Sequence, residues 1–270
     1  LLERVADGAL RQSVKAVYKI ADSRLEVVYS LDRHAKTVKM ETLVDWHEIG
    51  NEIIPVLDYR IPLAYETDRY QYDVPAGVLV RNGLHNDVPG LQYGMALREE
   101  GSCAILVSDS KYGYRGADNH LALTLINSST SPDPYPERGI HHITLWLGAG
   151  SADAKAAKEL ADACNRNLFY QPSNSHPGTL PMESGLFAAS ATHAVISAVL
   201  PKGDGSVLVR AYGTADQKDT VRLHFESPVV WAEQVNLAGT KQEGGVSING
   251  QDVEFEVAPL ALAEVCVKLS

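Results

Sequence analysis

The chain has 270 residues, of which 45% are hydrophobic and 21% are charged, and its formal net charge at pH 7 is −10. This length suits one large domain or two modest ones. The acidic balance argues against nucleic acid as a partner, because such binding relies on lysine and arginine neutralising phosphates. No apolar stretch approaches the roughly 20 residues that span a bilayer, so we expect no membrane partner.

Strand patterns dominate the first half of the chain. Alternating β-branched, aromatic and aliphatic residues, which half-buried pleated surfaces favour, begin after a turn at Asp7-Gly8. The expected strands are residues 9–20, 25–31, 37–44, 53–59, 92–97, 104–108, 121–127 and 140–147. Strands at this spacing, without alternating helices, predict antiparallel sandwiches rather than βαβ units.

One alanine-rich segment, residues 151–165, breaks this trend. Ser151 is expected to cap its start, and Asp153 places a negative charge in its first turn. Small and apolar residues then recur at helical spacing from Ala157 to Cys164. The sequence therefore predicts one amphipathic helix near residues 151–166, packed on a sheet.

A polar stretch rich in proline, glycine and serine, Gln171–Gly178, indicates a boundary between two β regions. Beyond it, hairpin signals occur at Gly203-Asp204-Gly205 and at Asn249-Gly250. The expected strands there are residues 194–200, 207–212, 220–225, 233–237, 246–248 and 253–262. We therefore predict an all-β chain with two domains, residues 1–175 and residues 178–270.

The start of the chain and its cysteines bear on where it works. It begins with Leu1, without an initiator methionine or a signal peptide, so we expect a piece of a longer protein. The three cysteines, Cys103, Cys164 and Cys266, are far apart and odd in number, which does not indicate a disulfide framework. We expect a reducing, cytoplasmic location.

The most informative stretch is the run from Asp109 to Gly116, Asp-Ser-Lys-Tyr-Gly-Tyr-Arg-Gly. Tyr112 and Tyr114 offer apolar faces and hydroxyls, which match the C–H patches and hydroxyl rim of a pyranose. Lys111 and Arg115 can donate to sugar hydroxyls, and Asp109 can accept from them. If the strand continues through the run, both tyrosines share one face. These five residues are the candidate substrate-binding residues. In the alternative interpretation, both tyrosines pack in a seam between domains and Arg115 pairs with a carboxylate.

Several short motifs occur along the chain in the order found in one known family. They are Asp45-Trp46-His47-Glu48, Tyr72-Asp73-Val74-Pro75-Ala76-Gly77, Asp87-Val88-Pro89-Gly90, the run 109–116, Pro132-Asp133-Pro134, Gly139-Ile140-His141-His142-Ile143-Thr144, Ser197-Ala198-Val199-Leu200 with Val209-Arg210-Ala211-Tyr212, and Pro259-Leu260-Ala261-Leu262 as the terminal strand. In this order they resemble the C-terminal β region of glycoside hydrolase family 38, the retaining α-mannosidases, of the bacterial type.

The resemblance implies a β supersandwich like that of galactose mutarotase, followed by a smaller C-terminal β-sandwich. It also implies a partner, the N-terminal catalytic domain of the same polypeptide, which carries the aspartate nucleophile and the zinc ligands. The substrates would be neutral mannose-containing glycans with terminal α-mannosides. The present chain would support that domain, could form the rim of its sugar site, and would be inactive alone.

The residues of the chain itself do not indicate a catalytic centre. A retaining glycosidase needs two carboxyl groups about 5–5.5 Å apart, but Asp45 and Glu48 are three residues apart on a strand and face opposite sides. Zinc needs three or four converging ligands. The adjacent His141 and His142 cannot both reach one ion, and no HExxH motif occurs. We predict no catalytic residue, no metal and no cofactor bound by this chain.

Two other functions remain open at this point. A stand-alone carbohydrate-binding β-sandwich module would bind sugar without any further domain. A mutarotase-like epimerase would need an acid and a base converging in one cleft.

Overall fold

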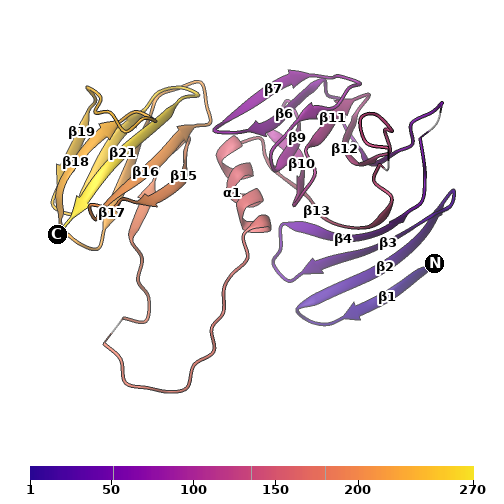
Figure 1. The fold of residues 1–270 in the computed structure, drawn as a ribbon, viewed down its shortest axis with the longest axis horizontal. Coiled ribbons are helices and arrows are strands. Elements are labelled where there is room, and N and C mark those ends of the chain that lie inside the picture. The colour runs from indigo at the N-terminus through magenta and orange to yellow at the C-terminus, as the bar shows by residue number, and fades with distance from the viewer. Residues whose placement is uncertain (51, 135, 180) are drawn as a thin grey trace. The chain divides into compact units, whose positions relative to one another are not determined.

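The computed structural model describes residues 1–50, 52–134, 136–179 and 181–270. It is built almost entirely of β-strands, with a single helix among these residues (Figure 1). This architecture confirms the predicted all-β class. Two compact units form, Leu1–Val74 with Leu79–Arg166, and Asn167–Ser270 with Pro75–Val78. In the described part of the chain, no helix is long and apolar enough to cross a membrane.

The first unit contains a nine-stranded sheet in the order β1-β2-β3-β4-β13-β10-β9-β6-β7 (Figure 1). Its strands are β1 (Leu2–Asp7), β2 (Arg11–Ile20), β3 (Ser23–Asp32), β4 (Thr37–Trp46), β6 (Arg69–Val74), β7 (Gly77–Asn82), β9 (Tyr93–Leu97), β10 (Ser102–Ser108) and β13 (Gly139–Ser151). The central antiparallel pair, β4 and β13, aligns from Gly139↔Trp46 to Gly148↔Thr37. The long strands β2 to β4 follow the alternation seen in the sequence.

A four-stranded sheet, in the order β5-β12-β11-β8, packs against one face of the large sheet. Its strands are β5 (Val56–Pro62), β8 (Val88–Pro89), β11 (Gly113–Ala117) and β12 (His120–Asn127). Val27 and Met40 from the large sheet meet Leu121, Leu123 and Tyr114 from the small one in a shared core. Apolar side chains from two facing sheets are what a β-sandwich buries.

The helix α1 (Ala154–Asn165) covers the opposite face of the large sheet. Ala157 and Ala161 pack with Met95 and Ile105, as the helical spacing predicts. The expected cap was wrong by two residues, because Ser151 is still paired with Ser102 in the β10–β13 ladder. Asp153 is the N-cap instead, and its Oδ1 accepts from the Ala156 N–H at 2.7 Å.

The second unit is a smaller sandwich of two four-stranded sheets, β14-β17-β20-β19 and β15-β16-β21-β18. Its strands are β14 (Phe187–Ser190), β15 (Ala194–Pro201), β16 (Ser206–Gly213), β17 (Asp219–Phe225), β18 (Val229–Val235), β19 (Val246–Asn249), β20 (Asp252–Val257) and β21 (Leu262–Leu269). Phe225, Phe255 and Val265 lie in its core. The hairpins predicted at 203–205 and 249–250 both form, with Gly205 and Gly250 at positive φ.

The last strand begins later in the chain than the sequence pattern predicts. Residues 253–262 were expected to be one strand, and the motif at 259–262 to be the terminal one. A turn follows β20 instead, where Leu260 adopts a φ of +50° and the Ala261 N–H donates to the Ala258 carbonyl. The terminal strand is β21, which supplies Ala263, Val265 and Val267 to the core.

Candidate functional site

The run from Asp109 to Gly116 forms the turn between β10 and β11 and most of β11. The Oγ of Ser108 accepts from the Lys111 N–H at 2.9 Å and so closes the turn. Asp109 ties the turn to β13, because its N–H donates to the Thr144 carbonyl at 3.1 Å and its Oδ2 accepts from the Thr144 N–H at 3.0 Å. These bonds hold the turn against the large sheet.

The two tyrosines of the run have different surroundings. Regular pairing of β11 starts at Gly113, so Tyr112 belongs to the turn and is 58% exposed. Tyr114 faces the core and is fully buried. The two rings were expected to share one face only if the strand continued through the run, and this condition is not met because β11 begins after Tyr112.

Tyr114 is fixed on all sides. Its hydroxyl donates to the Gln92 carbonyl at 2.9 Å, and its ring centroid lies 6.2 Å from that of Tyr72. Gly90 and Gly94 make room for the ring, since a Cβ there would lie 2.6 and 2.7 Å from its atoms. Burial raises the pKa of Tyr114 well above its usual value, and the nearby charge of Asp73 adds to the shift. Tyr114 therefore presents no surface to a ligand.

Arg115 joins two carboxylates, Asp58 and Asp87, that the sequence pattern does not mark as a site. Its Nη1 donates to Asp87 Oδ1 at 2.8 Å, and its Nη2 pairs with Asp58 Oδ2. The Thr124 hydroxyl lies 3.1 Å from Asp58 Oδ1 and 2.6 Å from Asp87 Oδ2. Gly113 leaves space for this network, because a Cβ there would lie 2.9 Å from Asp87 Oδ2. The network links strand β5 to the chain entering β8, as the alternative interpretation of Arg115 predicted.

The five candidate residues thus fall into two groups. Tyr112, Lys111 and Asp109 lie in the turn, where Tyr112 and Asp109 are exposed and Lys111 is half-buried. Tyr114 and Arg115 lie in β11, and their side chains bond to the Gln92 carbonyl and to Asp58 and Asp87. Asp87 could have been noticed in the sequence, because it opens the Asp-Val-Pro motif, whereas Asp58 carries no comparable signal.

The carboxylates considered for catalysis are engaged separately. Asp45 pairs with His47 Nε2 at 2.9 Å, while Glu48 accepts from the Ser23 hydroxyl at 2.8 Å. Among the described residues, no three or more His, Cys, Asp or Glu side chains are grouped to hold a metal ion. The zinc of the resembled family therefore has no fitting ligand set in the described parts of this chain.

Comparisons with known proteins identify similar sequences and a similar structure. Residues 2–135 match the family model described as "Glycosyl hydrolases family 38 C-terminal domain". The chain is 25% identical to human alpha-mannosidase 2C1 over 239 residues, which cover 83% of this chain and 22% of that protein. The mouse protein of the same name is 22% identical over 288 residues, covering 97% of this chain and 26% of its own length.

A solved structure has the same fold. It is a protein in glycosyl hydrolase family 38 from Enterococcus faecalis, with a TM-score of 0.79 and 12% sequence identity, covering 98% of this chain and 36% of its own. The present chain thus spans about a quarter of the two named relatives and about a third of this structure. The family model, the relatives and the shared fold together place the chain in the C-terminal region of glycoside hydrolase family 38.

Proposed function

We propose that this chain is the C-terminal, non-nucleophile-bearing portion of a retaining α-mannosidase that hydrolyses terminal α-mannosides and that acts on neutral mannose-containing glycans. The family match over residues 2–135 carries the proposal. The catalytic domain, with its aspartate nucleophile and its zinc, would lie in the N-terminal part of the same polypeptide. All three cysteines are free, which suits a reducing, cytoplasmic location.

Within this arrangement, the turn from Asp109 to Tyr112 forms part of the rim of the sugar site. Tyr112 exposes an aromatic ring, which can pack on the apolar face of a pyranose. Lys111 and Asp109 supply a donor and an acceptor beside it. Tyr114 and Arg115 act as positioning residues, because their own contacts run to the Gln92 carbonyl, just before β9, and across the small sheet.

The test uses the full-length enzyme. Tyr112→Ala is expected to lower kcat/KM for an aryl α-mannoside roughly three- to tenfold, as befits the loss of an aromatic contact worth about 0.5–1.5 kcal/mol. Leu237→Ala, a similarly exposed side chain in the second unit, is the matched control and should leave kcat/KM unchanged. A Tyr112→Ala enzyme that folds normally and keeps kcat/KM within about twofold would remove the rim role.

Two further measurements address the wider proposal. The 270-residue chain alone should not hydrolyse the aryl α-mannoside, and hydrolysis by it would place a nucleophile in this chain. NMR of the first-formed product should show retained anomeric configuration, since a covalent glycosyl-enzyme intermediate gives two inversions. Accelerated mutarotation by the isolated chain, followed by polarimetry, would favour the epimerase alternative.

A further inference from the structure

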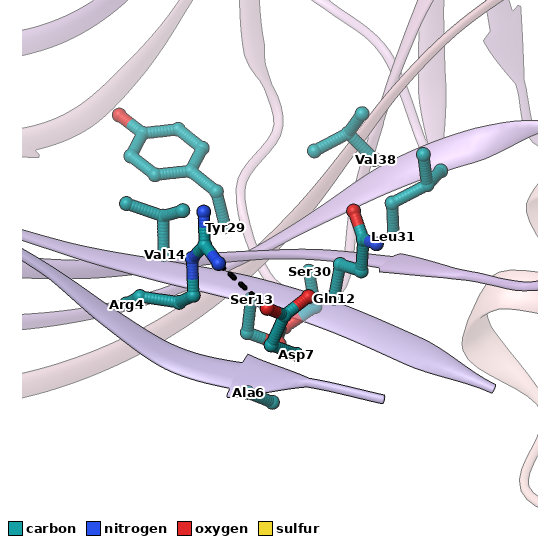
Figure 2. Close-up of a pocket in the computed structure, with 10 residues that line it drawn as sticks. All are labelled: Arg4, Ala6, Asp7, Gln12, Ser13, Val14, Tyr29, Ser30, Leu31 and Val38. Carbon is teal, nitrogen blue, oxygen red and sulfur yellow. Dashed lines mark hydrogen bonds and ion pairs between the residues drawn. The ribbon is translucent and has the colours of Figure 1, made fainter. Parts of the chain in front are cut away.

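A pocket of about 320 Å³ lies on the large sheet over β1, β2 and β3, far along the chain from the tyrosine run (Figure 2). It opens on the face that β3 and β4 turn toward the sandwich core. Of the described residues, those of β3 and β4 contribute Val27, Met40 and Val44 to that core, while β1 and β2 contribute none. The sheet therefore extends beyond its cover, and the pocket occupies the uncovered part.

A bulge in β1 brings a cation and an anion to the same side of this pocket. The register of β1 with β2 shifts between Arg4↔Val14 and Ala6↔Ser13. In a regular strand, residues three apart face opposite sides, but the extra residue of a bulge re-aims the side chains that follow it. Arg4 Nη1 and Asp7 Oδ2 consequently pair at 2.6 Å within the pocket (Figure 2).

The strand register arranges the remaining lining in two rows. Arg4 lies opposite Val14, and Val14 lies opposite Tyr29. Asp7 lies opposite Gln12, and Gln12 lies opposite Leu31. Each row thus runs from a polar side chain on the outer strands to an apolar or aromatic one on β3, and the ring of Tyr29 forms one wall (Figure 2).

The wall and the floor are already stable without a ligand. Tyr29 is half-buried beside Tyr18 and Tyr59, and burial with these neighbours raises its pKa far above the usual phenol value. Beneath the pocket, the buried hydroxyls of Ser13 and Ser30 satisfy one another at 2.8 Å. The groups left for a ligand are therefore Arg4, Asp7 and Gln12 and the apolar surface beside them.

We propose that this pocket binds a neutral saccharide. Its charges balance, because Arg4 is paired with Asp7, so the pocket has no net charge that would attract a charged ligand. Arg4 donates hydrogen bonds, Asp7 accepts them and Gln12 does both, which suits neighbouring sugar hydroxyls that act as both donor and acceptor. Val14, Leu31 and the Tyr29 ring match the C–H surface of a pyranose. The volume lies at the lower end for small-ligand sites. The proposal does not depend on the α-mannosidase role.

The experiment is an NMR titration of the 270-residue chain with methyl α-mannoside and methyl α-glucoside, and separately with glucuronate. At least one glycoside should bind saturably in the millimolar range and shift the amide signals of β1 to β3, and glucuronate should bind more weakly. Arg4→Ala and Gln12→Ala should each weaken the Kd at least fivefold. Arg24→Ala is the matched control. Arg24 on β3 also pairs with a carboxylate, that of Glu26, but on the face opposite the pocket, so this variant should leave the Kd within twofold.

Three results would overturn the proposal. One is the absence of shifts in β1 to β3 with either glycoside. Another is binding that Arg4→Ala and Gln12→Ala leave unchanged, which would locate the ligand elsewhere. The third is tighter binding of glucuronate than of the neutral sugars. None of these results bears on the kcat/KM of Tyr112→Ala in the full-length enzyme, so the two proposals can fail separately.

Discussion

The ring of Tyr70 on β6 lies directly against Gly116 on β11, so closely that a Cβ on Gly116 would sit 2.2 Å from the ring. Tyr70 is fully buried and belongs to the core between the two sheets of the first unit. The second glycine of the run at 109–116 is therefore required by packing between the sheets.

Gly116→Ala should destabilise the first unit. The added methyl group must displace a buried ring, and such overpacking typically costs about 1–3 kcal/mol. Urea unfolding should show this loss in the free energy of unfolding. Gly150→Ala is the matched control, because a Cβ there meets no atom within 4 Å, and it should change stability by less than about 0.5 kcal/mol. Equal effects of the two substitutions would contradict the packing argument.

Arg115→Ala should also destabilise the first unit, by about 1.5–3 kcal/mol, because hydrogen bonds to charged groups are lost. Asp58 and Asp87 would then face each other without a cation. Adding Asp58→Asn to Arg115→Ala should recover part of the loss, since one unpaired charge is removed. The exposed pair of Arg222 and Glu254 offers the comparison, and Arg222→Ala should cost less than about 1 kcal/mol. If Arg115→Ala is as mild, the network does not hold the small sheet together.

Asp73 should make the stability of the first unit depend on pH. Burial raises the pKa of Asp73, although its Oδ1 accepts from the N–H groups of Gln92 and Tyr93 at 2.8 and 2.9 Å. The folded state therefore holds this proton more tightly than the unfolded state. The contribution of Asp73 is largest below the ordinary carboxyl pKa, falls as the pH rises through the folded-state pKa, and is then constant.

Asp73→Asn keeps an acceptor for the two N–H groups and cannot titrate. The free energy of unfolding, measured by urea at several pH values from the ordinary Asp range upward, should fall less steeply with rising pH in the variant than in the wild type. Identical slopes in the two proteins would mean that Asp73 does not bind its proton more tightly in the folded state.

Asp219 should act in the opposite direction in the second unit. Burial alone would raise the pKa of Asp219, but backbone N–H groups outweigh it and lower the pKa, among them those of His193, Thr220 and Ala194. Their distances to the carboxylate are 2.6, 2.8 and 2.9 Å. The resulting stability is present above the ordinary Asp pKa and is lost as the pH falls through the lowered folded-state value.

Asp219→Ala should cost about 1–3 kcal/mol at neutral pH, because part-buried N–H donors lose their acceptor. The difference from the wild type should shrink in acid, where the wild-type carboxylate is protonated. A difference that stays constant with pH would show that the charge of the Asp219 carboxylate does not contribute to stability.

Periodic features of the chain were predictable, and features that depend on distant contacts were not. The alternation in β2 to β4 and the spacing from Ala157 to Cys164 report directly which face is buried, so these elements follow from local pattern. The bulge in β1 has no such pattern, because it only re-aims Arg4 and Asp7 once β2 is in place. The pocket at β1 to β3 was invisible in the sequence for this reason.

The run at 109–116 shows the same limit at the candidate site. Its residue types indicate a possible binding surface, but the exposure of Tyr112 and the burial of Tyr114 depend on where pairing with β12 begins. Arg115 meets Asp58 across β12, at a separation of 57 residues in the chain. No local pattern contains that contact.

The segment that follows α1 has a practical consequence for anyone handling the protein. Leu168, Phe169 and Tyr170 are almost fully exposed and lie outside any helix or strand, which makes them a natural target for chymotrypsin. Trypsin has no lysine or arginine to cut at between Arg166 and Lys202. Within this segment, trypsin can cut only after Arg166, so brief digestion with either protease should cleave it within a few residues of the same point. Each fragment would retain the strands of one core, although Pro75–Val78 of the second unit would stay on the N-terminal fragment. The two fragments could then be assayed separately for sugar binding and refolding.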